Sequence, residues 1–86
     1  SDIGTWGALW DIAPRDTAGN AVHGPAELVE SADCLVHSQG TLVTALGVRD
    51  LVIVATPDAV MVADRHRSDG VKTLVDRLEK RGLKQA

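Results

Sequence analysis

The sequence contains no phenylalanine and no tyrosine, and its 86 residues include only two tryptophans and one cysteine. A hydrophobic core must therefore be built mainly from Val, Leu and Ala side chains. A single cysteine, Cys34, cannot form an internal disulfide, which is typical of a reducing compartment and predicts a cytoplasmic protein. No apolar run approaches the roughly 18 residues of a membrane-spanning helix, and no signal-peptide pattern is present. We therefore expect a soluble protein with no membrane partner.

The sequence also lacks a strong excess of charge of either sign. Nine Lys and Arg residues stand against twelve Asp and Glu, giving a net charge of −3 without any block of like charge. This balance argues against nucleic acid as a partner. A chain of this length forms one small domain without room for a large catalytic cleft, and it has no P-loop, G-x-G-x-x-G or G-x-S-x-G motif. We expect no self-contained enzyme, and the absence of an initiator Met suggests a piece of a longer chain.

Helical periodicity marks both ends of the sequence. Residues 2–13 place Trp6 and Trp10 on one face of an amphipathic helix that Pro14 ends. Residues 14–25 are rich in turn formers and are expected to form a loop, with one short hairpin around residues 18–20. Residues 68–86 form a second amphipathic helix, beginning near Ser68 and ending at Gly82, whose apolar stripe contains Val71, Leu74, Val75 and Leu78.

Between these helices, residues 26–67 predict a β module. Short strand-like runs follow one another about every eight residues and are separated by turn residues, at Glu27–Glu30, Cys34–His37, Leu42–Leu46, Leu51–Ala55 and Ala59–Ala63. The last two runs do not alternate with polar residues, so both of their faces should be covered. The turn at residues 56–58 closes either a hairpin or a corner of a coiled parallel structure. No fixed residue recurs every six positions, so a strict hexapeptide β-helix is not indicated.

Few side chains point to chemistry by themselves. His23, His37 and His66 lack metal-ligand spacing, and Cys34 has no neighbouring base in sequence, which favours an inert, packed thiol. The two tryptophans are more typical of a core or interface than of a sugar-stacking platform. The connector at residues 64–67 (Asp-Arg-His-Arg) suits either local ion pairs, the favoured interpretation, or contact with an anionic oxygen.

One short string carries more information. Residues 1–10 (SDIGTWGALW) contain a D-[VI]-G-[ST]-W-x-A-L-W segment and resemble bacterial mannose-1-phosphate guanylyltransferases, which make GDP-mannose. Residues 34–38 resemble that family's S-x-V-H-S-x-G segment, and residues 47–54 and 58–65 resemble its following segments. The resemblance covers residues 1–81. The family that it indicates includes chains with a further C-terminal phosphomannose isomerase domain.

The resemblance implies a left-handed β-helix module and a role for the first residues. In sugar nucleotidyltransferases an Asp in the position of Asp2 is one of two carboxylates that hold Mg²⁺ at the nucleotide phosphates. Gly4 would leave room for substrate there, and Thr5 would donate a hydrogen bond to a substrate oxygen. A simpler interpretation of Asp2 is a helix cap. The glycine-rich nucleotide loop and the first metal Asp are missing, so we expect no catalytic residue, bound cofactor or activity in this chain alone.

The fold class we predict is mainly β, a short β-helix-like module with a flanking N-terminal and C-terminal helix. Residues 1–13 would end a nucleotidyltransferase core, and the module would support the sugar-phosphate site of a guanylyltransferase, which makes GDP-mannose and pyrophosphate from GTP and mannose 1-phosphate. Its partners would be the N-terminal nucleotidyltransferase domain of the same chain and other subunits of a homo-oligomer. The C-terminal helix would cap an open end of the module. The alternatives are a non-catalytic interaction domain with a Trp-lined face and a piece of a hexapeptide-type acyltransferase.

Overall fold

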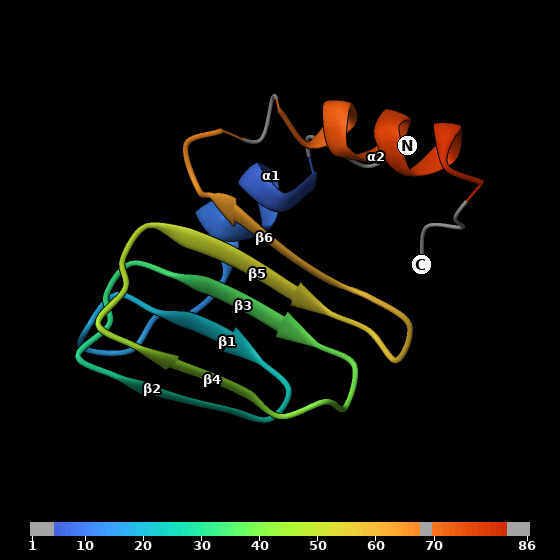
Figure 1. The fold of residues 1–86 in the computed structure, drawn as a ribbon. Coiled ribbons are helices and arrows are strands. Elements are labelled where there is room, and N and C mark those ends of the chain that lie inside the picture. Colours follow the sequence, from blue (N-terminus) through green and yellow to red (C-terminus); the bar gives the residue numbers. More distant parts are fainter. Residues whose placement is uncertain (1–4, 68–69, 83–86) are drawn as a thin grey trace.

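Parallel pairing between short strands builds most of the structure (Figure 1). The computed structural model describes residues 5–67 and 70–82. Its elements, in chain order, are α1 (Thr5–Ile12), β1 (Ala21–His23), β2 (Ala26–Val29), β3 (Leu35–Ser38), β4 (Val43–Leu46), β5 (Leu51–Ala55), β6 (Val60–Asp64) and α2 (Val71–Lys80). The prediction of a mainly β fold between two helices is confirmed.

The first five strands wind into two stacked coils. β1, β3 and β5 pair in parallel on one side, β2 and β4 pair in parallel on another, and a parallel bridge between Ala32 and Arg49 forms the short third side. Ala21 pairs with Leu35 and Leu35 with Val52, so the first coil takes 14 residues and the second 17. This stacking of successive coils is the arrangement of a β-helix, as predicted.

Each coil turns its corners through residues with positive φ. Gly19, Asp33 and Asp50 precede β1, β3 and β5 with φ of 83°, 57° and 58°. Gly24, between β1 and β2, has a φ of 91°, and a Cβ placed there would lie 2.2 Å from the backbone oxygen of Ser38 in the next coil. Only glycine allows the two coils to approach this closely at that corner.

β6 departs from the parallel coil. It pairs antiparallel with β5, so residues 56–58 close a hairpin, and the alternative of a coil corner is excluded. The hydroxyl of Thr56 accepts hydrogen bonds from the backbone N–H groups of Asp58 and Ala59 and thereby fixes the turn. Among the described residues the result is a four-stranded sheet, ordered β1-β3-β5-β6, and a two-stranded sheet of β2 and β4 that faces it.

The interior of the coil is small and aliphatic. Val36 and Cys34 are its largest fully buried side chains, and Ser38 is buried with them. The Cys34 thiol lies 3.4 Å from the carbonyl oxygen of Ala32. This packing supports the structural interpretation of Cys34.

The sequence-based prediction and the structure differ between the first helix and the first coil. The segment 14–25, predicted to be a loop, contains β1, and the expected hairpin around residues 18–20 is wrong. A turn replaces it, in which Asp16 Oδ1 accepts from the backbone N–H groups of Ala18 and Asn20. A strand of three residues is too short to produce a readable alternation, and β1 is held by pairing with β3, 14 residues later.

The C-terminal helix agrees with its prediction from Val71 onward. Arg77 and Lys80 lie in its last turn, where the helix dipole favours positive charge, and Gly82 follows it with a φ of 76°. The predicted start near Ser68 lies outside the described residues. No helix in the ranges 5–67 and 70–82 is long and apolar enough to cross a membrane.

Candidate functional site at the docking face of α1

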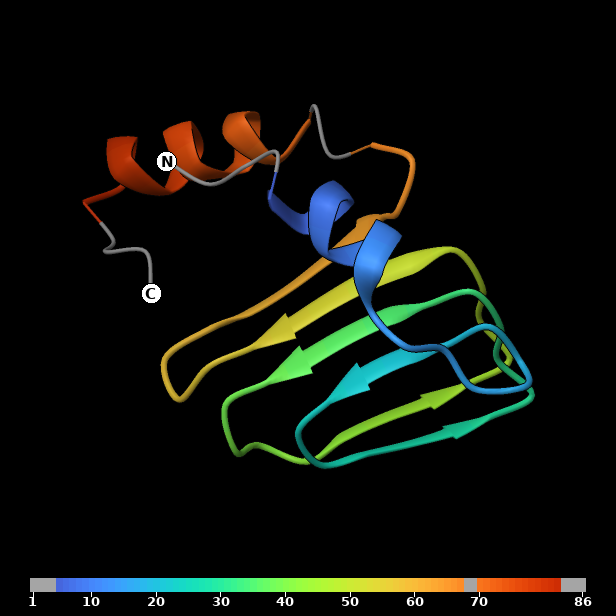
Figure 2. The ribbon, with the colours of Figure 1, turned by 180° about the vertical axis from the view of Figure 1, so that it is seen from behind.

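α1 lies across the outward face of the four-stranded sheet (Figure 2). Trp10, only 9% exposed, packs on Ala21, Leu35 and Val52, which are neighbours in register on β1, β3 and β5. Side chains packed around this cluster are Trp6, Leu9, Ala13, Val54 and Met61. The helix therefore folds back on its own strands, and the apolar face that its sequence predicts is covered by them.

Two arginines, one close to Trp10 in sequence and one distant from it, contact the Trp10 ring. The guanidinium carbons of Arg15 and Arg65 lie 4.0 and 4.1 Å from its centroid. Arg15 also donates a hydrogen bond of 3.0 Å to the Trp10 carbonyl oxygen. Contacts of a cation with an indole contribute roughly 0.5–2 kcal/mol each, so this helix is held by cations as well as by apolar packing.

Arg65 also joins α1 to the coil itself. Its Nε donates to the carbonyl oxygen of Asp33 at 3.0 Å, and its Nη2 donates to Asp50 Oδ1 at 3.1 Å. The neighbouring His66 lies 3.8 Å from the same Asp50 oxygen. The connector at residues 64–67 therefore forms an ion pair, as the favoured interpretation expected, but the pair is made with the distant Asp50 and not locally. Arg65 links a helix, a strand end and the corners of both coils.

A pair of histidines lies under the other tryptophan. The rings of His23 and His37 stack with centroids 4.6 Å apart, and Trp6 lies 5.5 Å from His37. The His37 Nδ1 atom is buried and has no hydrogen-bond partner. Burial, and secondly the charge of His23, lower the pKa of His37. The neutral form of His37 is therefore the one that fits beneath α1.

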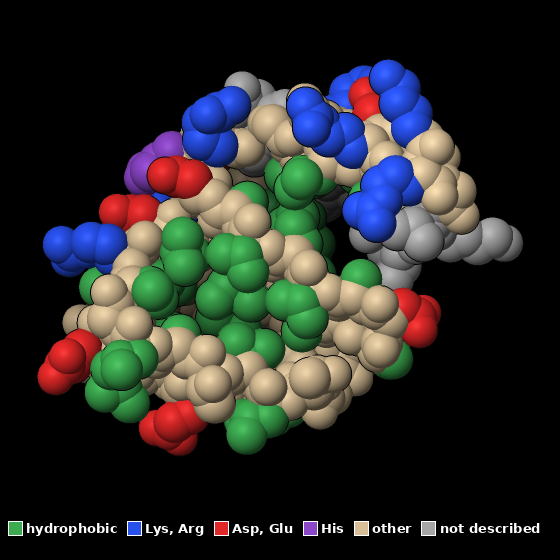
Figure 3. Space-filling model, viewed as in Figure 1, with side chains coloured by type: hydrophobic (Ala, Val, Ile, Leu, Met, Phe, Trp, Pro, Cys, Tyr) green, Lys and Arg blue, Asp and Glu red, His purple; other side chains and the backbone are tan. Residues whose placement is uncertain are grey.

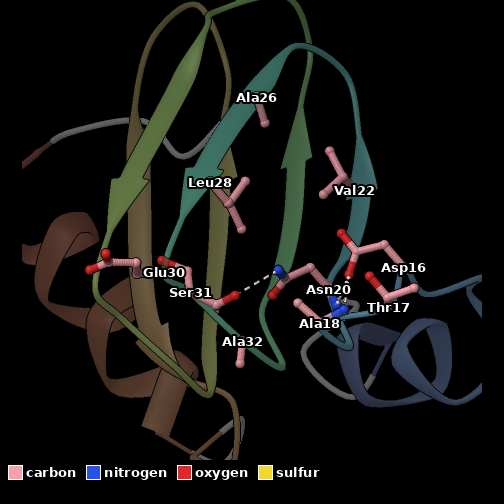
Figure 4. A pocket seen from close by; sticks show the side chains of 10 residues that line it. All are labelled: Asp16, Thr17, Ala18, Asn20, Val22, Ala26, Leu28, Glu30, Ser31 and Ala32. Atoms are coloured by element: carbon pink, nitrogen blue, oxygen red, sulfur yellow. Dashed lines mark hydrogen bonds between the residues drawn. The ribbon is translucent and has the colours of Figure 1, made fainter.

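The open end of the first coil holds a cavity of about 550 Å³ (Figure 4). Val22, Ala26 and Leu28 give it an apolar wall. Its buried amide, Asn20, is hydrogen-bonded within the coil: Nδ2 donates to the Ser31 carbonyl oxygen at 3.0 Å and Oδ1 accepts from the Cys34 N–H at 2.9 Å. Asn20 thus ties the start of the first coil to its end.

Sequence reasoning singled out Asp2, Gly4 and Thr5 for chemistry. Asp2 and Gly4 lie outside the described residues, and Thr5 is described only as the first residue of α1. Within the described ranges no group of three or more His, Cys, Asp or Glu side chains is placed to hold a metal ion.

Two structural residues were missed. Asn20 was interpreted as part of a polar loop, and Arg65 as one member of a solvated connector. The sequence does hint at a structural role for Asn20, because Asn20 follows Gly19 and lies four residues after Asp16, whose side chain accepts a hydrogen bond from the Asn20 backbone N–H. No local signal identifies Arg65, because its partners Asp33 and Asp50 are distant in sequence.

Comparison with known proteins gives a consistent result. Residues 16–78 match the family model described as "MannoseP isomerase/GMP-like beta-helix domain". The chain is 47% identical over 79 residues to a mannose-1-phosphate guanylyltransferase of Klebsiella pneumoniae, and the match covers 92% of this chain and 17% of that protein. It is 39% identical over 82 residues to the alginate biosynthesis protein AlgA of Pseudomonas aeruginosa, covering 95% of this chain and 17% of that protein.

A solved structure is also similar. A crystal structure described as mannose-1-phosphate geranyltransferase from Thermus thermophilus matches with a TM-score of 0.77 and 30% sequence identity. The match covers 92% of this chain and 24% of that one. The chain thus spans 17% of the length of the curated relatives it matches.

Proposed function

Because the chain belongs to the MannoseP isomerase/GMP-like β-helix domain family, we propose that it is the β-helix segment of a mannose-1-phosphate guanylyltransferase. Such an enzyme makes GDP-mannose and pyrophosphate from GTP and mannose 1-phosphate. The chain itself supplies no catalytic group. Its role is to hold the end of a preceding nucleotidyltransferase domain in place beside the sugar-phosphate site, in the cytoplasm.

The packing of α1 on the four-stranded sheet is the observation that best supports this proposal. Trp10 is buried on three neighbouring strands, and Arg15 and Arg65 both contact its ring. A helix held at so many points has little freedom to rotate on the sheet. Asp2 and Gly4 directly precede α1 in sequence, so a helix in a fixed position would restrict how they can approach a substrate.

The chemistry at Asp2 would need groups from the preceding domain. In the intact enzyme a bound Mg²⁺ would stabilise negative charge on the nucleotide phosphates, with Asp2 as one carboxylate ligand. Gly4 and Thr5 would face the substrate. One carboxylate is too few to hold the ion, which supports the assignment of a positional role to this chain and of catalysis to the larger protein.

A pyrophosphate-release assay with GTP and mannose 1-phosphate tests the proposal. It compares the 86-residue chain with a longer protein in which the same chain follows a nucleotidyltransferase domain. We expect turnover by the longer protein and none by the chain alone. Turnover by the chain alone, or an inactive but folded longer protein, would overturn the proposal.

A further inference from the structure

α1 packs on two neighbouring rows of the four-stranded sheet, and the two rows differ in chemistry. Trp10 covers the apolar row on β1, β3 and β5 that is described above. The next row along the strands, in register from β1 to β6, consists of His23, His37, Val54 and Met61. Trp6, one helical turn before Trp10, lies against His37 of this second row. One end of α1 therefore rests on aliphatic side chains and the other on side chains that can be protonated.

The two histidines, which we call the histidine pair, are stacked beneath Trp6 and have no acidic partner. His37 is half-buried and His23 is exposed at the edge of the sheet, and their rings are inclined by 13°. Among the residues that the structure describes, no carboxylate forms an ion pair with either ring. A positive charge on the histidine pair would thus have no negative charge to balance it.

The charged groups on the surrounding elements are directed elsewhere. Arg15 and Arg65 contact the ring of Trp10, and Asp11 is exposed on α1. Asp64, the charged residue of β6, lies three residues beyond the β6 member of the row. On the side of the sheet turned away from α1 apolar side chains gather in Figure 3, and the two β3 neighbours of His37 are uncharged. The charge closest in effect to His37 is therefore that of His23.

Protonation of the histidine pair conflicts with this packing. A protonated imidazole carries an N–H on both ring nitrogens, whereas Nδ1 of His37 is buried and has no hydrogen-bond partner. The protonated ring would hold a buried donor without an acceptor, which is unfavourable. Burial, and secondly the charge of His23, accordingly lower the pKa of His37. Neutral histidines fit under Trp6, and charged ones do not.

The two ends of α1 are held unequally. Trp10 is buried on three strands and is contacted by two arginines, whereas Trp6 is only half-buried. Gly7 directly follows Trp6, and glycine favours a helix less than any residue except proline. A helix of eight residues with an interior glycine has little stability of its own. The position of the Trp6 turn therefore depends on its contacts with the sheet.

We propose that the histidine pair acts as a proton switch on α1, such that its protonation releases Trp6 from the sheet while Trp10 stays docked. With the pair neutral, both tryptophans hold the helix. With the pair protonated, the helix is held at its Trp10 end alone. In a longer protein the switch would set how firmly the β-helix holds the segment that precedes Thr5 in sequence. The inference concerns the chain itself and does not depend on the proposed enzymatic role.

Fluorine NMR of the 86-residue chain labelled with 5-fluorotryptophan tests the proposal. The chain contains two tryptophans and so gives two resonances, which the variant Trp6→Phe assigns. The sample is titrated from about pH 8 to about pH 5, the range in which histidine changes its charge. We expect the Trp6 resonance to move toward its position in the urea-unfolded chain, with a midpoint below about pH 6.5, while the Trp10 resonance keeps its folded position. A Trp6 resonance that does not respond to pH, or a joint shift of both resonances, would overturn the proposal.

Three histidine variants identify the group that is protonated. His37→Leu cannot take up a proton and should keep Trp6 docked throughout the titration. His23→Gln removes the charge that opposes protonation of His37, so it should move the midpoint to higher pH. His66→Gln, at an exposed ring outside the pair, is the matched control and should respond as the unaltered chain does. Circular dichroism at about pH 8 verifies that each variant is folded. Release of Trp6 that persists in His37→Leu would contradict the proposal.

Discussion

Asp33 and Asp50 occupy the same corner of successive coils, and the side chain of Arg65 binds both. The two residues share a positive φ, of 57° and 58°, and Arg65 donates to the Asp33 carbonyl oxygen and to the Asp50 carboxylate. The same guanidinium lies over the Trp10 ring. The corner of the coil and the position of α1 are therefore coupled through one side chain.

Replacing Arg65 should weaken this junction. Because Asp50 is partly exposed, at 37%, and solvent screens its charge, we expect Arg65→Met to lower the free energy of unfolding by about 1–2 kcal/mol. Urea denaturation followed by circular dichroism measures this change. Arg49→Met, at an exposed position on the same coil, is the control and should alter stability by less than about 0.5 kcal/mol. Equal effects of both substitutions would contradict the assigned role of Arg65.

Gly24 allows the close approach of the two coils. We expect Gly24→Ala to destabilise the chain by about 2 kcal/mol or more, because a Cβ adds a clash with the Ser38 backbone to the strain of positive φ. Gly47→Ala has positive φ without a neighbour within 4 Å, so it should cost only the backbone strain of about 1 kcal/mol. Thermal or urea unfolding of the two variants compares them directly. A Gly24→Ala chain as stable as the Gly47→Ala chain would show that the coils separate more easily than the structure indicates.

His37 should make stability depend on pH. Its pKa is lowered in the folded chain, so between that pKa and the unfolded value of about 6.5 the unfolded chain binds more protons. The contribution of neutral His37 is therefore complete above about pH 6.5 and is lost as the pH falls through the folded pKa. Urea unfolding from about pH 8 to about pH 5 should show this decrease, and His37→Gln should reduce it. His66→Gln, at an exposed ring, should retain the full decrease, and an unchanged profile in His37→Gln would rule out this cause.

One prediction concerns the proposed role of Asp2 as a metal ligand. In a longer protein that includes a nucleotidyltransferase domain, Asp2→Asn should lower guanylyltransferase activity by about two orders of magnitude or more while the protein stays folded, since a metal carboxylate stabilises transition-state charge. Asp11→Asn, an exposed position on α1, is the matched control and should retain activity. Near-normal rates of Asp2→Asn at saturating Mg²⁺ would favour the capping role instead.

Local patterns predicted much of the fold. Helical spacing located α1 and α2, turn residues located the ends of β2 to β6, and the unbroken apolar run at Leu51–Ala55 matched β5 at both ends. The coil itself left no local signal, because its repeat is 14 residues once and 17 the next time, with glycine at some corners and Asp or Glu at others. A coil recurs in space through backbone pairing, which does not require the same residue at each turn.

The contacts of Arg65 with Asp33, Asp50 and Trp10 could not be predicted from the sequence for a similar reason. Its partners lie 15 and 32 residues away, and stacking on Trp10 adds a third element that is more distant still. Only the packing of α1 on the sheet brings them together. By contrast, the burial of Trp10 followed directly from the spacing of the apolar residues of α1.

The central claim is that this chain acts by holding α1 in place, and the kinetics of a Trp10 variant test it most directly. In a longer protein that contains the nucleotidyltransferase domain, kcat and KM for GTP and mannose 1-phosphate are measured for Trp10→Leu and for the control Ile12→Ala, whose side chain is 80% exposed. We predict a kcat at least about tenfold lower for Trp10→Leu, since small displacements of reacting groups are costly, with circular dichroism unchanged and the control within about twofold. A folded Trp10→Leu protein with unaltered kcat would contradict the account.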